Sequence, residues 1–222
     1  MPGKSMQSAT LEEVRLPPFG LPGTLDIPRA AHGLVLFAHG SGSSRLSPRN
    51  IYVANALREA GFGTLLFDLL SEEEAGSRSH VFDIELLAGR LTITADWLVT
   101  QPHAAALPLG LFGASTGAAA ALVTAARAPD MFCAVVSRGG RPDLAGRALR
   151  RVTAPTQLIV GGHDFDVLSL NQAALAELRC TKALEIVPGA THLFEEQGAL
   201  DQVIELARGW YLKYLRPDKG AP

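Results

Sequence analysis

The sequence predicts an α/β fold of three layers, in which helices cover both faces of a mostly parallel central sheet. Short apolar runs alternate along the chain with longer segments of helical spacing, an order that produces parallel strands joined by crossover helices. Several of these runs are apolar throughout, as strands buried on both faces are. With 47% apolar residues, a chain of 222 residues is long enough to bury such a core.

The individual elements follow this alternation in order. Prolines and glycines break residues 16–27, which predicts short edge strands or a hairpin. The main fold then begins with an apolar strand at residues 34–38 and a helix at residues 50–60 that stops at Gly61. The other expected elements are strands at residues 64–69, 107–112, 132–137, 157–160 and 183–187, a solvated helix start at residues 72–74, and a long helix at residues 81–100.

The chain shows no internal repeat, low-complexity tract or interdomain linker. It is therefore expected to form one domain at residues 11–215, with a flexible N-terminus at residues 1–10 and a C-terminal tail at residues 216–222. Only a short connection lies between Gly140 and Pro155, so no cap domain is expected over the carboxyl ends of the strands.

The pentapeptide Gly113-Ala-Ser-Thr-Gly117 lies between an apolar strand and an alanine-rich helix. A G-x-S-x-G sequence in this context forms a nucleophile elbow, a turn so tight that the neighbours of the serine must be nearly free of side chains. Ser115 is therefore a candidate nucleophile, and the N–H of Thr116 is a candidate donor to the oxyanion that forms when Ser115 attacks a carbonyl. The alternative is an ordinary glycine-rich turn.

A nucleophilic serine needs a base and a carboxylate that orients the base, and in this architecture they follow the serine as acid and then histidine. Asp164 and His192 occur in that order, each after an apolar strand. Asp143 follows the strand after the elbow strand and is a second candidate acid, and Asp166 lies two residues beyond Asp164. We favour Asp164 because it lies in a glycine turn directly after a strand.

The ordered motifs His39-Gly-Ser-Gly42, Gly113-Ala-Ser-Thr-Gly117, Gly161-Gly-His-Asp164 and Ala190-Thr-His192 resemble the α/β-hydrolase superfamily, and most closely its small, lidless dienelactone hydrolase-like branch. The resemblance covers about residues 11–215. It implies that the N–H of Ser41 is the second oxyanion donor. Dienelactone hydrolases proper carry a cysteine at the elbow, where this chain has Ser115. A phosphate-binding reading of the loop after His39 is weak, because Arg45 stands where a glycine is required.

Three arginines are candidate substrate-binding residues: Arg45, Arg138 and Arg141. Arg138 and Arg141 follow a sheet strand, on the side where α/β sheets bind ligands. The three side chains could bind an anion together. The alternative is that they pair with surface carboxylates or brace loops, since arginine is usually exposed.

Composition excludes several other classes of function. The net charge of −2 and the lack of long basic runs argue against nucleic acid as a partner. Neither a signal peptide nor a membrane span is readable, which favours a cytoplasmic location. The two cysteines, Cys133 and Cys180, and the histidines lack the spacing of metal ligands, so neither a metal nor a cofactor is expected.

The sequence therefore predicts a serine hydrolase that cleaves small carboxylic esters, or lactones, through an acyl-enzyme. Without a cap, short esters should be better substrates than long ones. An acyltransferase or a cofactor-free perhydrolase would use the same triad, and a non-catalytic binding protein of this fold is a third reading. Natural substrate and oligomeric state are not readable from the sequence.

Overall fold

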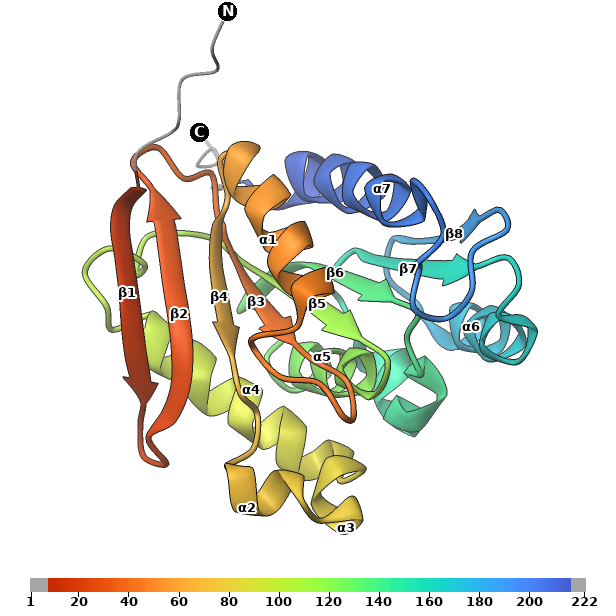
Figure 1. Ribbon diagram of the computed structural model, residues 1–222, viewed down its shortest axis with the longest axis horizontal. Coiled ribbons are helices and arrows are strands. Elements are labelled where there is room, and N and C mark those ends of the chain that lie inside the picture. Colours follow the sequence, from red (N-terminus) through yellow and green to blue (C-terminus); the bar gives the residue numbers. More distant parts are fainter. Residues whose placement is uncertain (1–7, 217–222) are drawn as a thin grey trace, which may run out of the picture.

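Eight strands form a single sheet in the order β1-β2-β4-β3-β5-β6-β7-β8 in the computed structural model, which describes residues 8–216 (Figure 1). The strands are β1 (Ser8–Leu16), β2 (Leu21–Pro28), β3 (Leu34–Ala38), β4 (Gly63–Phe67), β5 (Leu109–Ala114), β6 (Phe132–Arg138), β7 (Thr156–Gly161) and β8 (Lys182–Val187). Strands β4, β3, β5, β6, β7 and β8 run parallel, whereas β1 and β2 pair antiparallel at one edge. This mostly parallel sheet confirms the predicted fold class.

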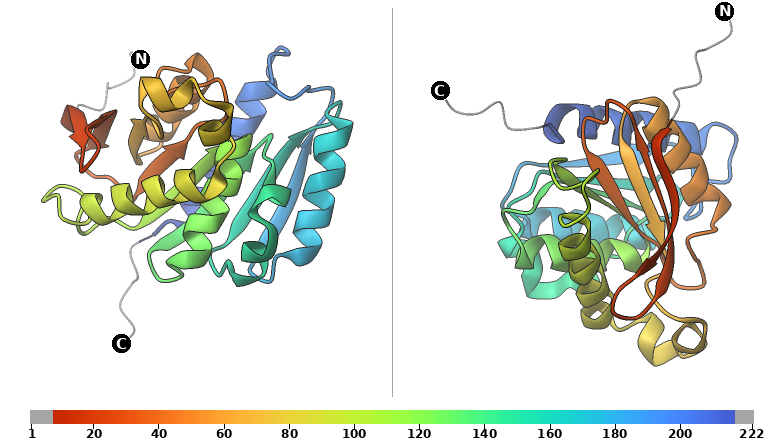
Figure 2. Two further views of the ribbon diagram at one scale, coloured as in Figure 1. Left: turned by 90° about the horizontal axis from the view of Figure 1, so that it is seen from below. Right: turned by 90° about the vertical axis from the view of Figure 1, so that its left-hand side faces the viewer.

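Helices cover both faces of the sheet (Figures 1 and 2). One face carries α1 (Pro48–Glu59) and α7 (Ala199–Tyr214). The opposite face carries α4 (Ile84–Leu98), α5 (Thr116–Arg127), α6 (Phe165–Glu177) and the 3₁₀ helix η1 (Pro142–Arg151). Two short helices, α2 (Glu72–Ala75) and α3 (Arg78–Val81), lie between β4 and α4.

The strand side chains alternate between two apolar cores. In β3, Leu34, Leu36 and Ala38 pack with α4 and α5, whereas Val35 and Phe37 pack with α1 and α7. Both faces of the strand are buried, which explains why its sequence is apolar without interruption.

The N-terminal boundary differs from the prediction. Residues 8–10 were expected to be flexible, but they belong to β1, which pairs with β2 along its length. Backbone pairing supplies order that the polar sequence of this edge strand does not indicate. Residues 1–7 and 217–222 of the predicted termini lie outside the described residues.

The long helix predicted at residues 81–100 starts later, at Ile84, because the Asp83 side chain accepts the Leu86 N–H at 2.9 Å and caps it. The predicted helix start at residues 72–74 is confirmed as α2, with a capping box between Ser71 and Glu74. The connection between Gly140 and Pro155 is η1, which packs against α5 and α6 and forms no cap.

Candidate active site

Ser115 lies at the centre of the sheet, directly after β5 and before α5. Its φ of +51° is one of two positive values among the described non-glycine residues. Such a conformation is strained for an L-residue and persists where the surroundings enforce it, as at a nucleophile elbow. Because β5 lies between β3 and β6, the turns after these two strands flank Ser115.

Both glycines of the elbow are required because backbone atoms of neighbouring segments lie very close to their Cα atoms. A Cβ at Gly117 would lie 2.1 Å from the Ala38 carbonyl oxygen, and one at Gly113 would lie 2.4 Å from the Ala118 Cα. Neither contact is sterically possible, so larger residues would push α5 away from the sheet. The requirement for glycine at these two positions, expected from the motif, is therefore a packing requirement.

The segment after β6 holds the elbow in place. The Ser115 N–H donates to the Arg138 carbonyl at 3.3 Å, and the Ser115 carbonyl accepts the Arg141 N–H at 3.0 Å. Both backbone groups of the candidate nucleophile are thus fixed, and its side chain projects from a turn that cannot easily relax.

His192 and Asp164 are in direct contact. His192 Nδ1 lies 2.7 Å from Asp164 Oδ2, and these residues follow β8 and β7. An ionised carboxylate only accepts hydrogen bonds, so this contact places the imidazole proton on Nδ1 and leaves Nε2 as an acceptor. His192 and Ser115 line one pocket of about 590 Å³.

The two other candidate acids are placed differently. Asp143 accepts two hydrogen bonds of 2.8 Å from the Arg141 guanidinium. Asp166 is exposed in the first turn of α6. Of the three carboxylates considered, Asp164 is the one that contacts His192.

The candidate oxyanion donors come from α5 and from the loop after β3. Thr116 is the first residue of α5, so its N–H has no acceptor within the helix. The Ser41 N–H donates to Thr116 Oγ1 at 2.9 Å and therefore already has an acceptor in this structure. A Cβ at Gly40 would lie 2.8 Å from the Ser115 Cβ, so glycine lets the loop approach the elbow.

His39 anchors this loop. Its Nε2 accepts the Leu69 N–H at 3.1 Å, and its Nδ1 lies 3.1 Å from the Gly40 carbonyl. These partners select the neutral ring with the proton on Nδ1, and burial lowers the pKa of His39 below its usual value. These contacts give His39 a structural role in holding the loop.

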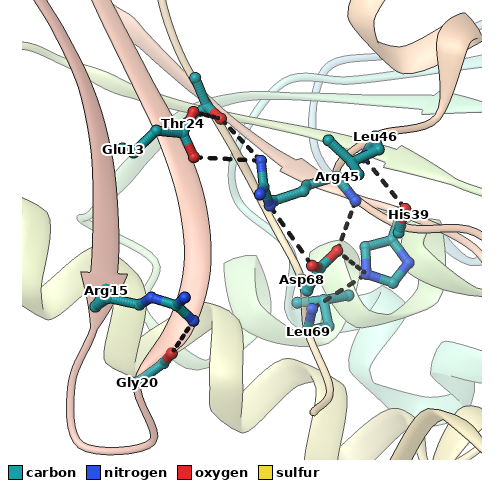
Figure 3. Close-up of polar contacts among 10 residues, drawn as sticks. Glu13, Arg15, Gly20, Thr24, His39, Arg45, Leu46, Asp68 and Leu69 are labelled. Atoms are coloured by element: carbon teal, nitrogen blue, oxygen red, sulfur yellow. Dashed lines mark hydrogen bonds and ion pairs between the residues drawn. The ribbon is translucent and has the colours of Figure 1, made fainter. Parts of the chain in front are cut away.

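The three candidate arginines have different environments. Arg45 lies among Glu13, Thr24 and Asp68, with ion-pair distances of 3.4 Å to Glu13 and 3.7 Å to Asp68 (Figure 3). It therefore braces β1 and β2 against the loop after β4. Arg141 pairs with Asp143. Arg45 and Arg141 thus pair with carboxylates and brace loops, which is the alternative to substrate binding.

Arg138 is the exception among them. It is 7% exposed and lines the same pocket as Ser115 and His192. No acceptor within the described residues bonds to its Nε or Nη1.

Sequence reasoning missed a second chamber beside the site. It measures about 330 Å³ and is lined by the candidate oxyanion donors and by apolar side chains from the segment around α2 and α3. Those apolar residues are Leu70, Ala75, Val81 and Leu87. No local pattern signals this chamber, because its walls come from separate parts of the chain.

Arg49 and Phe194 were also missed. Arg49 reaches the pocket from α1, and Phe194 has a φ of +57° and places its ring beneath Arg138. Neither residue belongs to a recognisable motif. A strained residue two positions after a candidate base can be noticed only once the backbone is known.

Within residues 8–216, no three His, Cys, Asp or Glu side chains are grouped closely enough to hold a metal ion. Cys180 carries a free thiol. None of the helices in this range is long and apolar enough to cross a bilayer.

No family model matches the chain. A dienelactone hydrolase from Anabaena variabilis is 54% identical in sequence, with a TM-score of 0.89 and coverage of 95% of this chain and 99% of that one. Est1E from Butyrivibrio proteoclasticus shares the fold at 15% identity, with a TM-score of 0.77 and coverage of 92% of this chain and 98% of that one.

A curated protein of Mycobacterium tuberculosis strain H37Rv, provisionally named a phosphoribosyl transferase, is 59% identical over 198 residues. The match covers 89% of this chain and 45% of that protein. The chain thus spans less than half the length of this curated relative.

Proposed function

Because the chain belongs to the dienelactone hydrolase family of α/β hydrolases, we propose that it is a serine hydrolase that cleaves small carboxylic esters or lactones through an acyl-enzyme. One observation carries the proposal. His192 contacts Asp164 at 2.7 Å and shares a pocket with Ser115, which stands on a strained strand-to-helix turn. Nucleophilic catalysis by serine uses such a serine together with a histidine base that a carboxylate orients.

The contact between Asp164 and His192 supports the following roles. Ser115 Oγ attacks the ester carbon, and its proton passes to His192 Nε2. Asp164 holds Nδ1–H, and its charge stabilises the imidazolium that forms. His192 then protonates the leaving alcohol, and water releases the acid from Ser115 by the reverse sequence of proton transfers.

The negative charge of the tetrahedral intermediate lies beside the first N–H groups of α5. The Thr116 N–H is one donor, helped by the positive end of the helix dipole. The Ser41 N–H is the second, and it exchanges Thr116 Oγ1 for the substrate oxygen during the reaction. Two of the three candidate arginines, Arg45 and Arg141, then brace loops. The third, Arg138, faces the substrate.

The name of the mycobacterial relative does not carry over to this site. The matching section is 45% of that protein. Arg45 replaces the glycine that a phosphate-binding loop needs, and the Ser-His-Asp arrangement is suited to acyl transfer. We therefore propose ester hydrolysis for the section of the relative that this chain matches. We do not propose phosphoribosyl transfer in the pocket of Ser115.

An acyltransferase or perhydrolase on the same residues would differ only in the acceptor. Addition of methanol or hydrogen peroxide to a reacting ester distinguishes them, because a dominant methyl ester or peracid product would identify an acceptor preferred over water. A non-catalytic binding protein would hydrolyse none of the esters.

We expect the purified protein to hydrolyse p-nitrophenyl acetate or butyrate and to be inactivated by an alkyl fluorophosphonate. The phosphonate should be attached to Ser115, because an activated serine attacks phosphorus as it attacks an acyl carbon. Peptide mapping by mass spectrometry locates the adduct. Labelling of a different serine, with activity lost in parallel, would contradict the assignment.

The chamber of about 330 Å³ changes the expectation of a simple open pocket, because it offers an apolar wall beside Thr116 and Ser41. We propose that it binds the acyl chain. The variant Ala75→Trp should partly fill it from an exposed position on α2. Each methylene prevented from burial costs up to about 0.8 kcal/mol, so kcat/KM for octanoate should fall about tenfold or more.

Under the same assay the acetate ester should be hardly affected by Ala75→Trp. The matched control is Glu73→Trp, on the same short helix but outside the chamber lining. If both variants change the octanoate-to-acetate ratio equally, the chamber is not the acyl site.

A further inference from the structure

The apolar chamber beside Thr116 has one wall that receives little support from the two cores. Ala75 and Val81 of this wall belong to α2 and α3, and every residue of these two short helices is exposed or half-buried. The helices lie at the end of the molecule where the β1–β2 hairpin turns (Figures 1 and 2). Short helices depend on tertiary contacts, so other interactions must hold this wall in place.

An ion pair ties the wall to α4. Arg90 Nη2 lies 2.7 Å from Glu74 Oε1, and Glu74 precedes Ala75 in α2. Arg90 is 6% exposed and lies about one helical turn after Leu87, which lines the chamber from α4. The ion pair therefore joins the chamber wall formed by α2 to the wall formed by α4.

The carboxylate of Glu74 also shapes α2. Its Oε2 accepts the Ser71 N–H at 2.9 Å, and Ser71 Oγ accepts the Glu74 N–H at 3.2 Å. This capping box uses one carboxylate oxygen, while Arg90 uses the other. Because Ser71 and Ala75 both line the chamber, the contact with Arg90 affects lining residues on either side of Glu74.

The β1–β2 hairpin in turn holds Arg90. The guanidinium carbon lies 3.3 Å from the centroid of the Phe19 ring, a cation–π contact with the turn of the hairpin. Arg15 closes this turn, since its Nη1 donates to the Gly20 carbonyl at 3.3 Å (Figure 3). Nε and Nη1 of Arg90 have no acceptor among the described residues, so its position depends on the Phe19 ring and on Glu74.

The volume of the chamber limits the length of a chain that it can hold while this wall stays in place. A space of about 330 Å³ holds about eleven groups of the size of a water molecule, at roughly 30 Å³ each. An octanoyl chain fits within that number, and a myristoyl chain exceeds it. A longer chain can enter only if α2 moves outward.

We propose that Arg90 is a positioning residue that limits the length of the acyl chain, because it holds α2 against the chamber. It acts through Glu74 and is itself fixed by Phe19, since it lies outside the chamber lining. This inference rests on the proposed function, in which the chamber receives the acyl chain. It makes the substrates esters of short-chain and medium-chain acids.

The variant Arg90→Met removes the charge and the planar face and keeps much of the side-chain length. The ratio of kcat/KM for 4-nitrophenyl myristate to that for 4-nitrophenyl octanoate should rise about tenfold or more, the value of two further buried methylenes. The change should appear in KM, and kcat for the acetate ester should stay within about twofold. An unchanged ratio would overturn the inference.

Two variants at less buried positions repeat the test without altering Arg90. Glu74→Gln keeps an oxygen for the Ser71 N–H and removes the charge that Arg90 contacts. Phe19→Leu removes the ring from the half-exposed turn of the hairpin. Each should raise the myristate-to-octanoate ratio in the same direction as Arg90→Met. Wild-type ratios in both variants would overturn the inference even if Arg90→Met failed to fold.

The matched control is Arg127→Met. It breaks an ion pair between α5 and Glu85 on α4, outside the chamber lining. The myristate-to-octanoate ratio should stay at the wild-type value in this variant. A rise as large as that in Arg90→Met would indicate a general loosening of α4 and overturn the specific role of Arg90.

Hydrogen exchange followed by mass spectrometry tests the contact without any reaction. Amides of residues 71–82 should exchange faster in Arg90→Met, while those of β5 and α5 keep their wild-type protection. If the wild-type protein hydrolysed no ester, the proposed function would fail, and the exchange result would still decide whether Arg90 holds α2. Unchanged exchange at residues 71–82 would overturn the inference. Faster exchange with an unchanged ratio would remove Arg90 from the control of chain length.

Discussion

Ser115→Ala is expected to lower kcat for p-nitrophenyl butyrate by about three or more orders of magnitude, since the members of a triad act as a unit. The substitution removes one oxygen and keeps the backbone contacts of Ser115 to Arg138 and Arg141. The melting temperature should therefore change little. Initial rates at saturating ester, with circular dichroism of the same sample, measure both quantities.

Ser169→Ala is the matched control for Ser115→Ala. Ser169 is exposed on α6, and its hydroxyl donates to the Phe165 carbonyl. This variant should retain wild-type activity. A folded Ser115→Ala protein with full activity would remove Ser115 from the mechanism and redirect the search to another nucleophile.

Asp164→Asn is expected to reduce kcat by about three to four orders of magnitude. Its amide can donate to Nδ1 in place of accepting from it, which would move the ring proton to Nε2 and leave no acceptor for the Ser115 proton. The pair of rates for Asp164→Asn and Asp143→Asn decides which carboxylate orients the histidine.

Asp143→Asn should keep activity within about tenfold of the wild type. Asp143 bonds to the Arg141 side chain, while Arg141 holds the Ser115 carbonyl through its backbone N–H, so weakening the side-chain pair affects the elbow only indirectly. The opposite ranking of the two variants would assign the acid to Asp143.

The sequence did not predict that Arg138 is buried or that Arg45 lies among carboxylates. All three candidate arginines have the same chemistry in the sequence, and two of them follow the same strand. Their roles depend on which carboxylates fold beside them. Glu13 and Asp68 reach Arg45 from β1 and from the end of β4, a pairing that no local pattern encodes (Figure 3).

Ser41 shows a similar limit. The motif identifies the loop, and Gly40 does lie against Ser115 as that loop requires. The motif does not indicate that the Ser41 N–H bonds to Thr116 Oγ1, because this contact joins the loop after β3 to α5 across 75 residues.

The sequence by itself determined the α/β class, the strands from β3 to β8 to within two residues, and the order of Ser115, Asp164 and His192. These features are local, since apolar periodicity and glycine turns act over a few residues. Tertiary structure alone decided that Asp164, and neither Asp143 nor Asp166, contacts His192, and that Arg138 is buried with no acceptor for its Nε and Nη1 among the described residues. It also created the chamber beside Thr116. Contacts of this kind depend on strand order and on the packing of helices that are distant in sequence, and the free energy that selects them is shared over the whole fold.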